Sequence, residues 1–124
     1  MRLFLLLPLL VLAACDLAGT DGVDYGDPYR LTLQTEPTLV DDKLSVPVDY
    51  GGGCAAHTFS VRSRLDGGTA EVWLVHDANG DSCEALISET VTAGVPAEVA
   101  AAERVALLVP ATTQADAEAR VRLR

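Results

Sequence analysis

The chain has 124 residues, with 18 acidic and 9 basic side chains and a formal net charge of -9. This length is typical of a single domain. The charge excludes a nucleic-acid-binding protein, which needs a basic face against phosphates, and argues against electrostatic docking on anionic lipid. Hydrophobic residues make up 49% of the chain, which is too large a share for a disordered protein.

Residues 1–14 have the pattern of a secretory signal peptide. Arg2 supplies a positive charge, and residues 3–12 are apolar apart from Pro8. This stretch is too short to remain in a bilayer as a spanning helix, which needs about 20 residues. Small residues then precede Cys15, as at a cleavage site. We therefore expect residues 1–14 to be removed from an exported protein.

The end of this segment, Leu12-Ala13-Ala14-Cys15, resembles the lipobox of bacterial lipoproteins. The resemblance covers residues 1–15 and implies that cleavage precedes Cys15 and that the Cys15 thiol is diacylated, as with palmitate. The mature protein would then be anchored to a membrane of the bacterial cell envelope, on its extracytoplasmic (periplasmic) side, with inner and outer membrane both open. The alternative is an ordinary signal peptide, with Cys15 as a disulfide partner.

The next segment, residues 16–27, is rich in Gly and Asp and has no hydrophobic period. These properties are typical of a flexible tether. The sequence therefore predicts a lipidated cysteine and tether over residues 15–27, followed by one folded domain over residues 28–124.

Short segments with alternating apolar residues, separated by turn residues, fill this domain. Seven strands in about 95 residues predict an all-β fold, an antiparallel Ig-like β-sandwich with one short helical turn at residues 96–102. Pro47 lacks a ladder donor, so we expect its strand to lie at an edge or to break there. The expected strands are residues 29–35, 43–50, 57–64, 69–76, 85–92, 104–109 and 118–124.

The middle hairpin has a predicted register. Asp66-Gly67 is a strong two-residue turn signal, and this turn would pair Phe59 with Leu74. The same register places His57 opposite His76, at the open end of the hairpin and on the inward face.

Two cysteines, Cys54 and Cys83, lie beyond that same end. If Cys15 is lipidated, they are an even pair in an oxidising compartment, and we expect them to form a disulfide. The alternative is a tetrahedral site for zinc or copper that combines both cysteines with His57 and His76. With a disulfide present, the two histidines could still bind a metal together with Asp77 or Asp81.

The pattern GGGC-x2-H, a strand, and HDANGDSCEA over residues 51–85 resembles small secreted lipoproteins of uncharacterised function. This resemblance implies a shared scaffold and no activity. No nucleophile-elbow motif is present, and we expect no enzyme and no cofactor. The leading hypothesis is a membrane-anchored, non-enzymatic module that binds an envelope protein or ligand. The alternatives are a periplasmic metal-binding protein that uses His57 and His76, and a small hydrolase or inhibitor.

Overall fold

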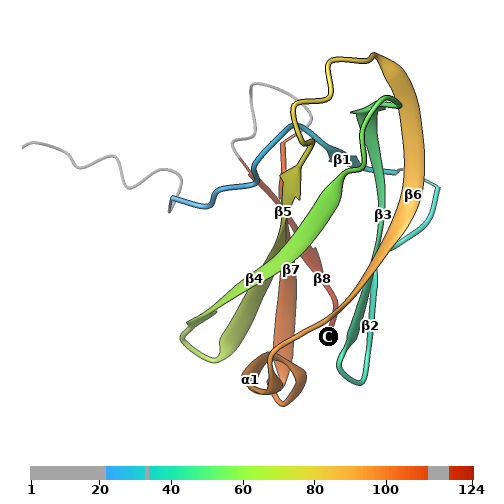
Figure 1. Cartoon of the computed structure of the whole chain (residues 1–124). Helices are drawn as coiled ribbons and strands as arrows, with labels where there is room; N and C mark the ends of the chain where they lie inside the picture. Colours follow the sequence, from blue (N-terminus) through green and yellow to red (C-terminus); the bar gives the residue numbers. More distant parts are fainter. Residues whose placement is uncertain (1–21, 33, 112–117) are drawn as a thin grey trace, which may run out of the picture.

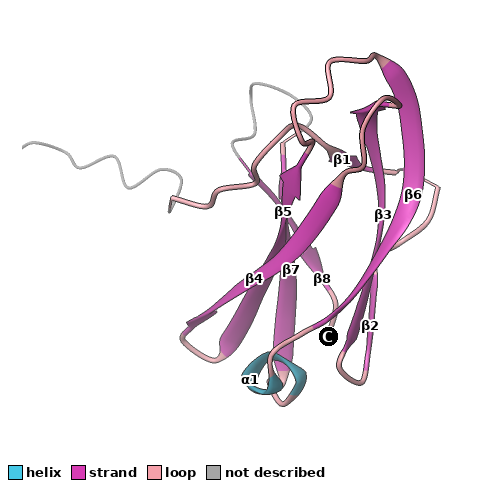
Figure 2. Ribbon diagram, viewed as in Figure 1, coloured by secondary structure: helices cyan, strands magenta, loops and turns pink. Residues whose placement is uncertain are grey.

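The fold is a sandwich of two four-stranded β-sheets (Figures 1 and 2). It is seen in a computed structural model that describes residues 22–32, 34–111 and 118–124. In the first sheet, β3 pairs with β6 on one side and with β1 and β2 on the other; the second has the order β4-β5-β7-β8. The elements are β1 (Arg30–Leu31), β2 (Thr38–Val40), β3 (Lys43–Gly52), β4 (Thr58–Asp66), β5 (Thr69–Asp77), β6 (Ala85–Gly94), α1 (Ala97–Ala100), β7 (Arg104–Pro110) and β8 (Glu118–Arg122).

The all-β fold and the short helix at residues 96–102 are confirmed. Two details differ from the sequence-based prediction. The short strand β2 adds an eighth strand, and β5 pairs with β7 in parallel, so the second sheet is mixed rather than antiparallel. The parallel pair arises because the chain leaves β5, runs through β6 in the other sheet and α1, and re-enters beside β5 in the same direction.

The core lies between the sheets and is built from alternate residues of each strand. Strand β3 contributes Leu44, Val46 and Val48, while β5 and β7 contribute residues that include Val72 and Leu107. All five are 1% exposed or less. Because strand side chains alternate between faces, the residues between these core positions face the outer side of their sheet.

Strand β3 corrects the expectation for Pro47. This strand is neither at an edge nor broken, because it pairs with β6 through all ten of its residues and with β1 and β2 on its other side. The carbonyl of Pro47 accepts a hydrogen bond from the amide of Thr32, so the proline nitrogen faces the gap between β1 and β2. No ladder donor is needed at that point.

The hairpin β4–β5 has a register two residues away from the expected one. The turn residues are Gly67 and Gly68, so Phe59 pairs with His76 rather than with Leu74. Gly67 has φ 60°, and glycine adopts this conformation without the steric cost that Asp66 would meet as a central turn residue. A shift of two residues leaves every side chain on its expected face.

The segment at residues 25–27 is attached to the sheet. The amide of His76 donates to the carbonyl of Tyr25, and the amide of Asp27 donates to the carbonyl of His76. The sequence places these residues in the tether, whereas in the structure they pair with the end of β5. Cys15 and the rest of residues 1–21 lie outside the described residues.

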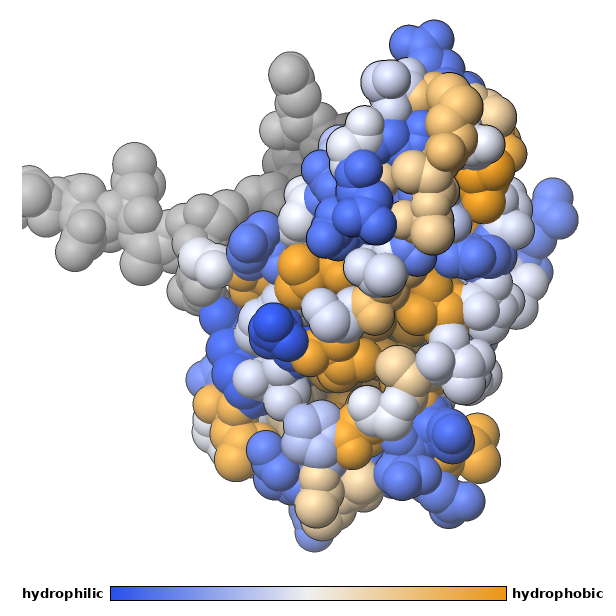
Figure 3. All heavy atoms as spheres, viewed as in Figure 1, coloured by the Kyte–Doolittle hydropathy of each residue, from blue (hydrophilic) through white to orange (hydrophobic). Residues whose placement is uncertain are grey.

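Apolar side chains fill the space between the edge strands β4 and β6. Figure 3 shows them gathered on this side of the molecule. The partly buried apolar residues of these strands include Phe59, Val61, Ile87 and Val91. Within the part of the chain that the structure describes, no helix has the length and hydropathy needed to cross a bilayer.

Candidate functional site

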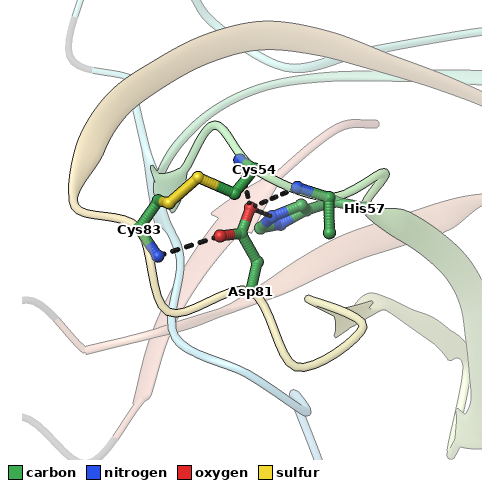
Figure 4. The surroundings of a disulfide bond; sticks show 5 residues. Cys54, His57, Asp81 and Cys83 are labelled. Carbon is green, nitrogen blue, oxygen red and sulfur yellow. Dashed lines mark hydrogen bonds and ion pairs between the residues drawn. A yellow bond between two sulfur atoms is a disulfide. The ribbon is translucent and has the colours of Figure 1, made fainter.

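A disulfide between Cys54 and Cys83 closes the end of the sandwich at which β3 and β5 finish (Figure 4). It joins the loop after β3 to the loop after β5. Gly52 leads into the first loop, where a Cβ atom would lie 2.6 Å from Nε2 of His57. Gly53 has φ 113°. Glycine is therefore required here because the backbone bends beside the disulfide and the His57 ring packs directly against it.

The carboxylate of Asp81 holds both loops together. Its Oδ2 accepts hydrogen bonds from the amides of Cys54 and Ala55, each at 2.9 Å, and its Oδ1 accepts one from the amide of Cys83 at 2.9 Å. His57 Nε2 lies 2.9 Å from Oδ2. The hydrogen bond from His57, followed by those from the backbone amides, holds the pKa of Asp81 well below its ordinary value. Asp81 is therefore ionised and acts as an acceptor only.

From Asp81 a chain of hydrogen bonds runs through both histidines. Nδ1 of His57 lies 2.8 Å from Nε2 of His76, and Nδ1 of His76 lies 3.2 Å from the carbonyl oxygens of Asp27 and Pro28. Carbonyl and carboxylate oxygens only accept, so both ends of the chain require an N–H. The two histidine rings therefore link the Asp81 carboxylate to the backbone carbonyls of Asp27 and Pro28.

The convergence of His57 and His76 therefore occurs as the hairpin pattern predicts, although they meet diagonally rather than directly across the hairpin. Each of the four ring nitrogens already lies within hydrogen-bond distance of a protein atom. The one group of described residues spaced as metal ligands is Cys54, Asp81 and Cys83, and its two sulfur atoms are joined to each other. A metal ion would have to displace several of these contacts.

Aromatic rings enclose the histidine pair. Phe59 stacks on His76 with 4.4 Å between ring centroids, and Tyr50 stacks on His57 at 4.6 Å. The hydroxyl of Tyr29 donates to the buried carbonyl of Leu74 at 2.8 Å, and burial raises the pKa of Tyr29 well above its ordinary value. His76 is 2% exposed, as is the side chain of His57. These rings thus seal one end of the core.

A second polar cluster, which the sequence analysis missed, lies on the outer face of the β4-β5-β7-β8 sheet. Glu71 of β5 is completely buried. Its Oε1 lies 2.8 Å from Nε of Arg64, and its Oε2 lies 2.7 Å from Nη2 of Arg120. Arg120 is 49 residues away in sequence, so no local pattern identifies this contact. The only sequence signal is the concentration of arginine in residues 62–64 and 104–124.

Comparisons with known proteins bear on the fold alone. No family model matches the chain, and no curated protein matches it. Among solved structures, the chain is similar to a NigD-like immunity protein from Bacteroides caccae, with a TM-score of 0.53 and 19% sequence identity. The match covers 82% of this chain and 51% of that protein, so this chain spans about half the length of its structural neighbour. At this identity the similarity supports the β-sandwich architecture.

The structure brings most of the predicted site residues together. Cys54 and Cys83 form a disulfide, and the rings of His57 and His76 lie within hydrogen-bond distance of each other. Asp81 belongs to the same site as the acceptor that links the two loops, whereas Asp77 accepts a hydrogen bond from the amide of Asn79 within its own turn. The buried, fully hydrogen-bonded arrangement is suited to holding two loops and one end of the core in place.

Proposed function

We propose that this protein is a bacterial lipoprotein, anchored through Cys15 on the extracytoplasmic side of a cell-envelope membrane, and that its β-sandwich is a non-enzymatic binding module. The observation that carries the proposal is the order of the N-terminal residues: a positive charge, an apolar stretch, two small residues and then Cys15. Residues 16–24 separate this cysteine from Tyr25, the first of the described residues that pairs with the sheet. They are long enough to connect an anchor to a separate folded domain.

The disulfide supports the proposed location. Bonds between cysteines persist in the periplasm and outside the cell and are rare in the cytosol. The pair Cys54–Cys83 uses two of the three cysteines in the sequence, and the third is Cys15. A lipidated first residue and an internal disulfide account for all three cysteines.

The geometry of the histidine site favours a structural role over a catalytic one. Its rings are buried and each ring nitrogen has a protein partner, so a substrate would meet no free base there. The structural neighbour is described as an immunity protein, which supports the same choice. Any partner would therefore be recognised by the surface of the sandwich.

The anchor is tested by expressing the full chain in a bacterium fed with an alkyne analogue of palmitate. We expect the label to reach the protein and the intact mass to show acylation of a chain that begins at Cys15. The Cys15→Ser variant should carry no label and should leave the membrane fraction. An unlabelled wild-type chain, or a label retained by Cys15→Ser, would overturn the proposed anchor.

A further inference from the structure

Basic side chains gather on the outer face of the β4-β5-β7-β8 sheet. The strand registers place five of the nine basic residues at outward-facing positions of this sheet, although the whole chain has a net charge of -9. They are Arg62, Arg64, Arg104, Arg120 and Arg122. The registers place four acidic residues on the same face, at positions Asp66, Glu71, Asp77 and Glu118. Five basic against four acidic positions leave this face with a small positive excess on an otherwise acidic protein, and Asp77 lies at the opposite end of β5 from Thr69.

Part of this face forms an open groove with a volume of about 350 Å³. We call it the arginine groove. Its lining residues are Thr69, Arg104, Val105, Ala106, Arg120, Arg122 and Arg124, and none of them is acidic. Ala106 faces outward between Glu71 of β5 and Arg122 of β8. Because alanine is small, it leaves a hollow that the surrounding arginine side chains border.

The arginines of the groove differ in their partners. Arg120 is held by the buried Glu71, and Nη2 of Arg124 donates to the carbonyls of Val99 and Ala100. Arg104 and Arg122 are exposed, and neither has a hydrogen bond or ion pair among the described residues. The groove thus combines guanidinium groups fixed in place with two whose donors are free for a ligand. A fixed guanidinium loses little freedom on binding, which favours affinity.

We propose that the arginine groove binds an extended acidic segment of a partner protein. Arg120 and Arg122 are two residues apart on β8, an edge strand, so their positions repeat at about 6.7 Å. Side chains on one face of an extended peptide repeat at the same distance. Carboxylates at alternate positions of such a peptide match this spacing, and the guanidinium fork pairs with carboxylates in a bidentate manner.

The position of the groove favours a polypeptide over lipid head groups as its anion. Figure 1 shows the chain entering from residue 22 at one end of the sandwich, where Gly26 lies against His76 near the end of β5. The groove lies towards the other end, where Thr69 begins β5 and pairs with Arg104. A strand of this length separates the two by about 25 Å. This step rests on the proposed anchor at Cys15, which would hold the groove away from the bilayer.

The net charge of the protein does not prevent such binding. At physiological ionic strength the Debye length is about 8 Å, so acidic residues of the opposite sheet are screened from a ligand in the groove. The local guanidinium groups then dominate the field that the ligand meets. Added salt should weaken the complex, because each contact is an exposed ion pair.

The proposal is tested with the full chain purified in detergent and a fluorescein-labelled peptide in which Glu alternates with Thr. A second peptide with Gln in place of Glu is the ligand control. Arg104→Gln/Arg122→Gln removes the two unpaired charges, and Ala106→Leu fills the groove without a change of charge. Arg30→Gln/Lys43→Gln removes the same charge from the other sheet. Fluorescence polarisation reports binding, and circular dichroism verifies that each variant is folded.

We expect the Glu peptide to bind and the Gln peptide not to bind. Arg104→Gln/Arg122→Gln should weaken binding about tenfold or more, the loss expected for two ion pairs of ordinary strength, and Ala106→Leu should weaken it as well. Arg30→Gln/Lys43→Gln should stay within about twofold of the wild type. If Ala106→Leu does not fold, the test of the proposal rests on Arg104→Gln/Arg122→Gln.

Three results would overturn the proposal: no binding of the Glu peptide below about 1 mM, equal losses in the two double variants, or arginine-dependent binding to phosphatidylglycerol vesicles without binding to the peptide. These measurements are separate from acylation of Cys15. If the chain binds the peptide but Cys15 is not acylated, the proposed anchor is overturned and the proposed peptide site stands. If Cys15 is acylated but the chain does not bind the peptide, the proposed peptide site is overturned and the proposed anchor stands.

Discussion

The buried carboxylate of Glu71 allows a quantitative prediction about the outer face of the second sheet. Glu71 has no exposed surface, whereas the side chains of Arg64 and Arg120 are 28% and 52% exposed. Burying a charge is costly, and its partners offset that cost only while they are present. Removing the arginine charges should therefore be far more damaging in the presence of Glu71 than in its absence.

The perturbation is Arg64→Met/Arg120→Met, which keeps most of the aliphatic length of each side chain. In the wild-type background we expect the free energy of unfolding to fall by about 3 kcal/mol. This is at the lower end of the range for breaking a buried ion pair, because both arginine side chains reach water. Such a loss lowers the melting temperature by about 15 °C in a domain of this size. Glu71→Met alone should change the free energy of unfolding by less than about 1 kcal/mol, since it removes the charge and its desolvation together.

The decisive variant combines all three substitutions. With Met at position 71, the arginine substitutions should cost less than about 1 kcal/mol, which covers loss of the Arg64 contact over the Trp73 ring at 5.7 Å. The coupling energy is then about 2 kcal/mol. Urea unfolding is followed by the fluorescence of Trp73, the only tryptophan in the chain. Equal costs of the arginine substitutions in the two backgrounds would refute the reasoning.

Three further predictions concern the end of the sandwich that carries the disulfide. Replacing both Cys54 and Cys83 by serine should lower the free energy of unfolding by about 3.5 kcal/mol, given their sequence separation of 29, and a urea-measured loss below about 1 kcal/mol would contradict this. Gly26→Ala places a Cβ atom 2.1 Å from a carbonyl oxygen of β5 at φ 70°, so it should speed amide exchange at residues 25–27. Gly22→Ala, with φ 61° and open space, is the matched control, and equal exchange rates would count against the docking contact. Because the folded-state pKa of Asp81 lies below its ordinary value of 3.8, its stabilising effect is present above that pH and is lost as the pH falls below it. Asp81→Asn should therefore flatten the acid limb of a stability profile measured by urea unfolding, and an unchanged limb would show that another group controls it.

Much of the fold could be predicted because strand alternation is a local property. Residues 43–50 and 69–76 show which side chains face inward without any knowledge of their partners, and the structure agrees at Leu44, Val46, Val72 and Leu74. The predicted register of the β4–β5 hairpin was wrong because the sequence offers two adjacent dipeptides, Asp66-Gly67 and Gly67-Gly68, that can each form the turn. The error was two residues, which preserves the facing direction, so the approach of His57 to His76 was still correct.

The features that were missed depend on contacts between distant segments. The tether prediction included residues 25–27 because their composition is polar, and their pairing depends on the unpaired edge that His76 offers at the end of β5. The burial of Glu71 depends on Arg120, which comes from the last strand. The parallel pair β5–β7 likewise depends on a connection that passes through the other sheet.

That interleaved connectivity has a consequence for how the molecule unfolds. The chain passes between the two sheets three times, after β3, after β5 and after β6, so each sheet contains strands from both halves of the sequence. No cut of the chain separates one complete sheet from the other. Neither half can bury its apolar face alone, and loss of either sheet exposes the core of both. The domain should therefore melt as a single cooperative unit, with the same midpoint for Trp73 fluorescence and for backbone circular dichroism.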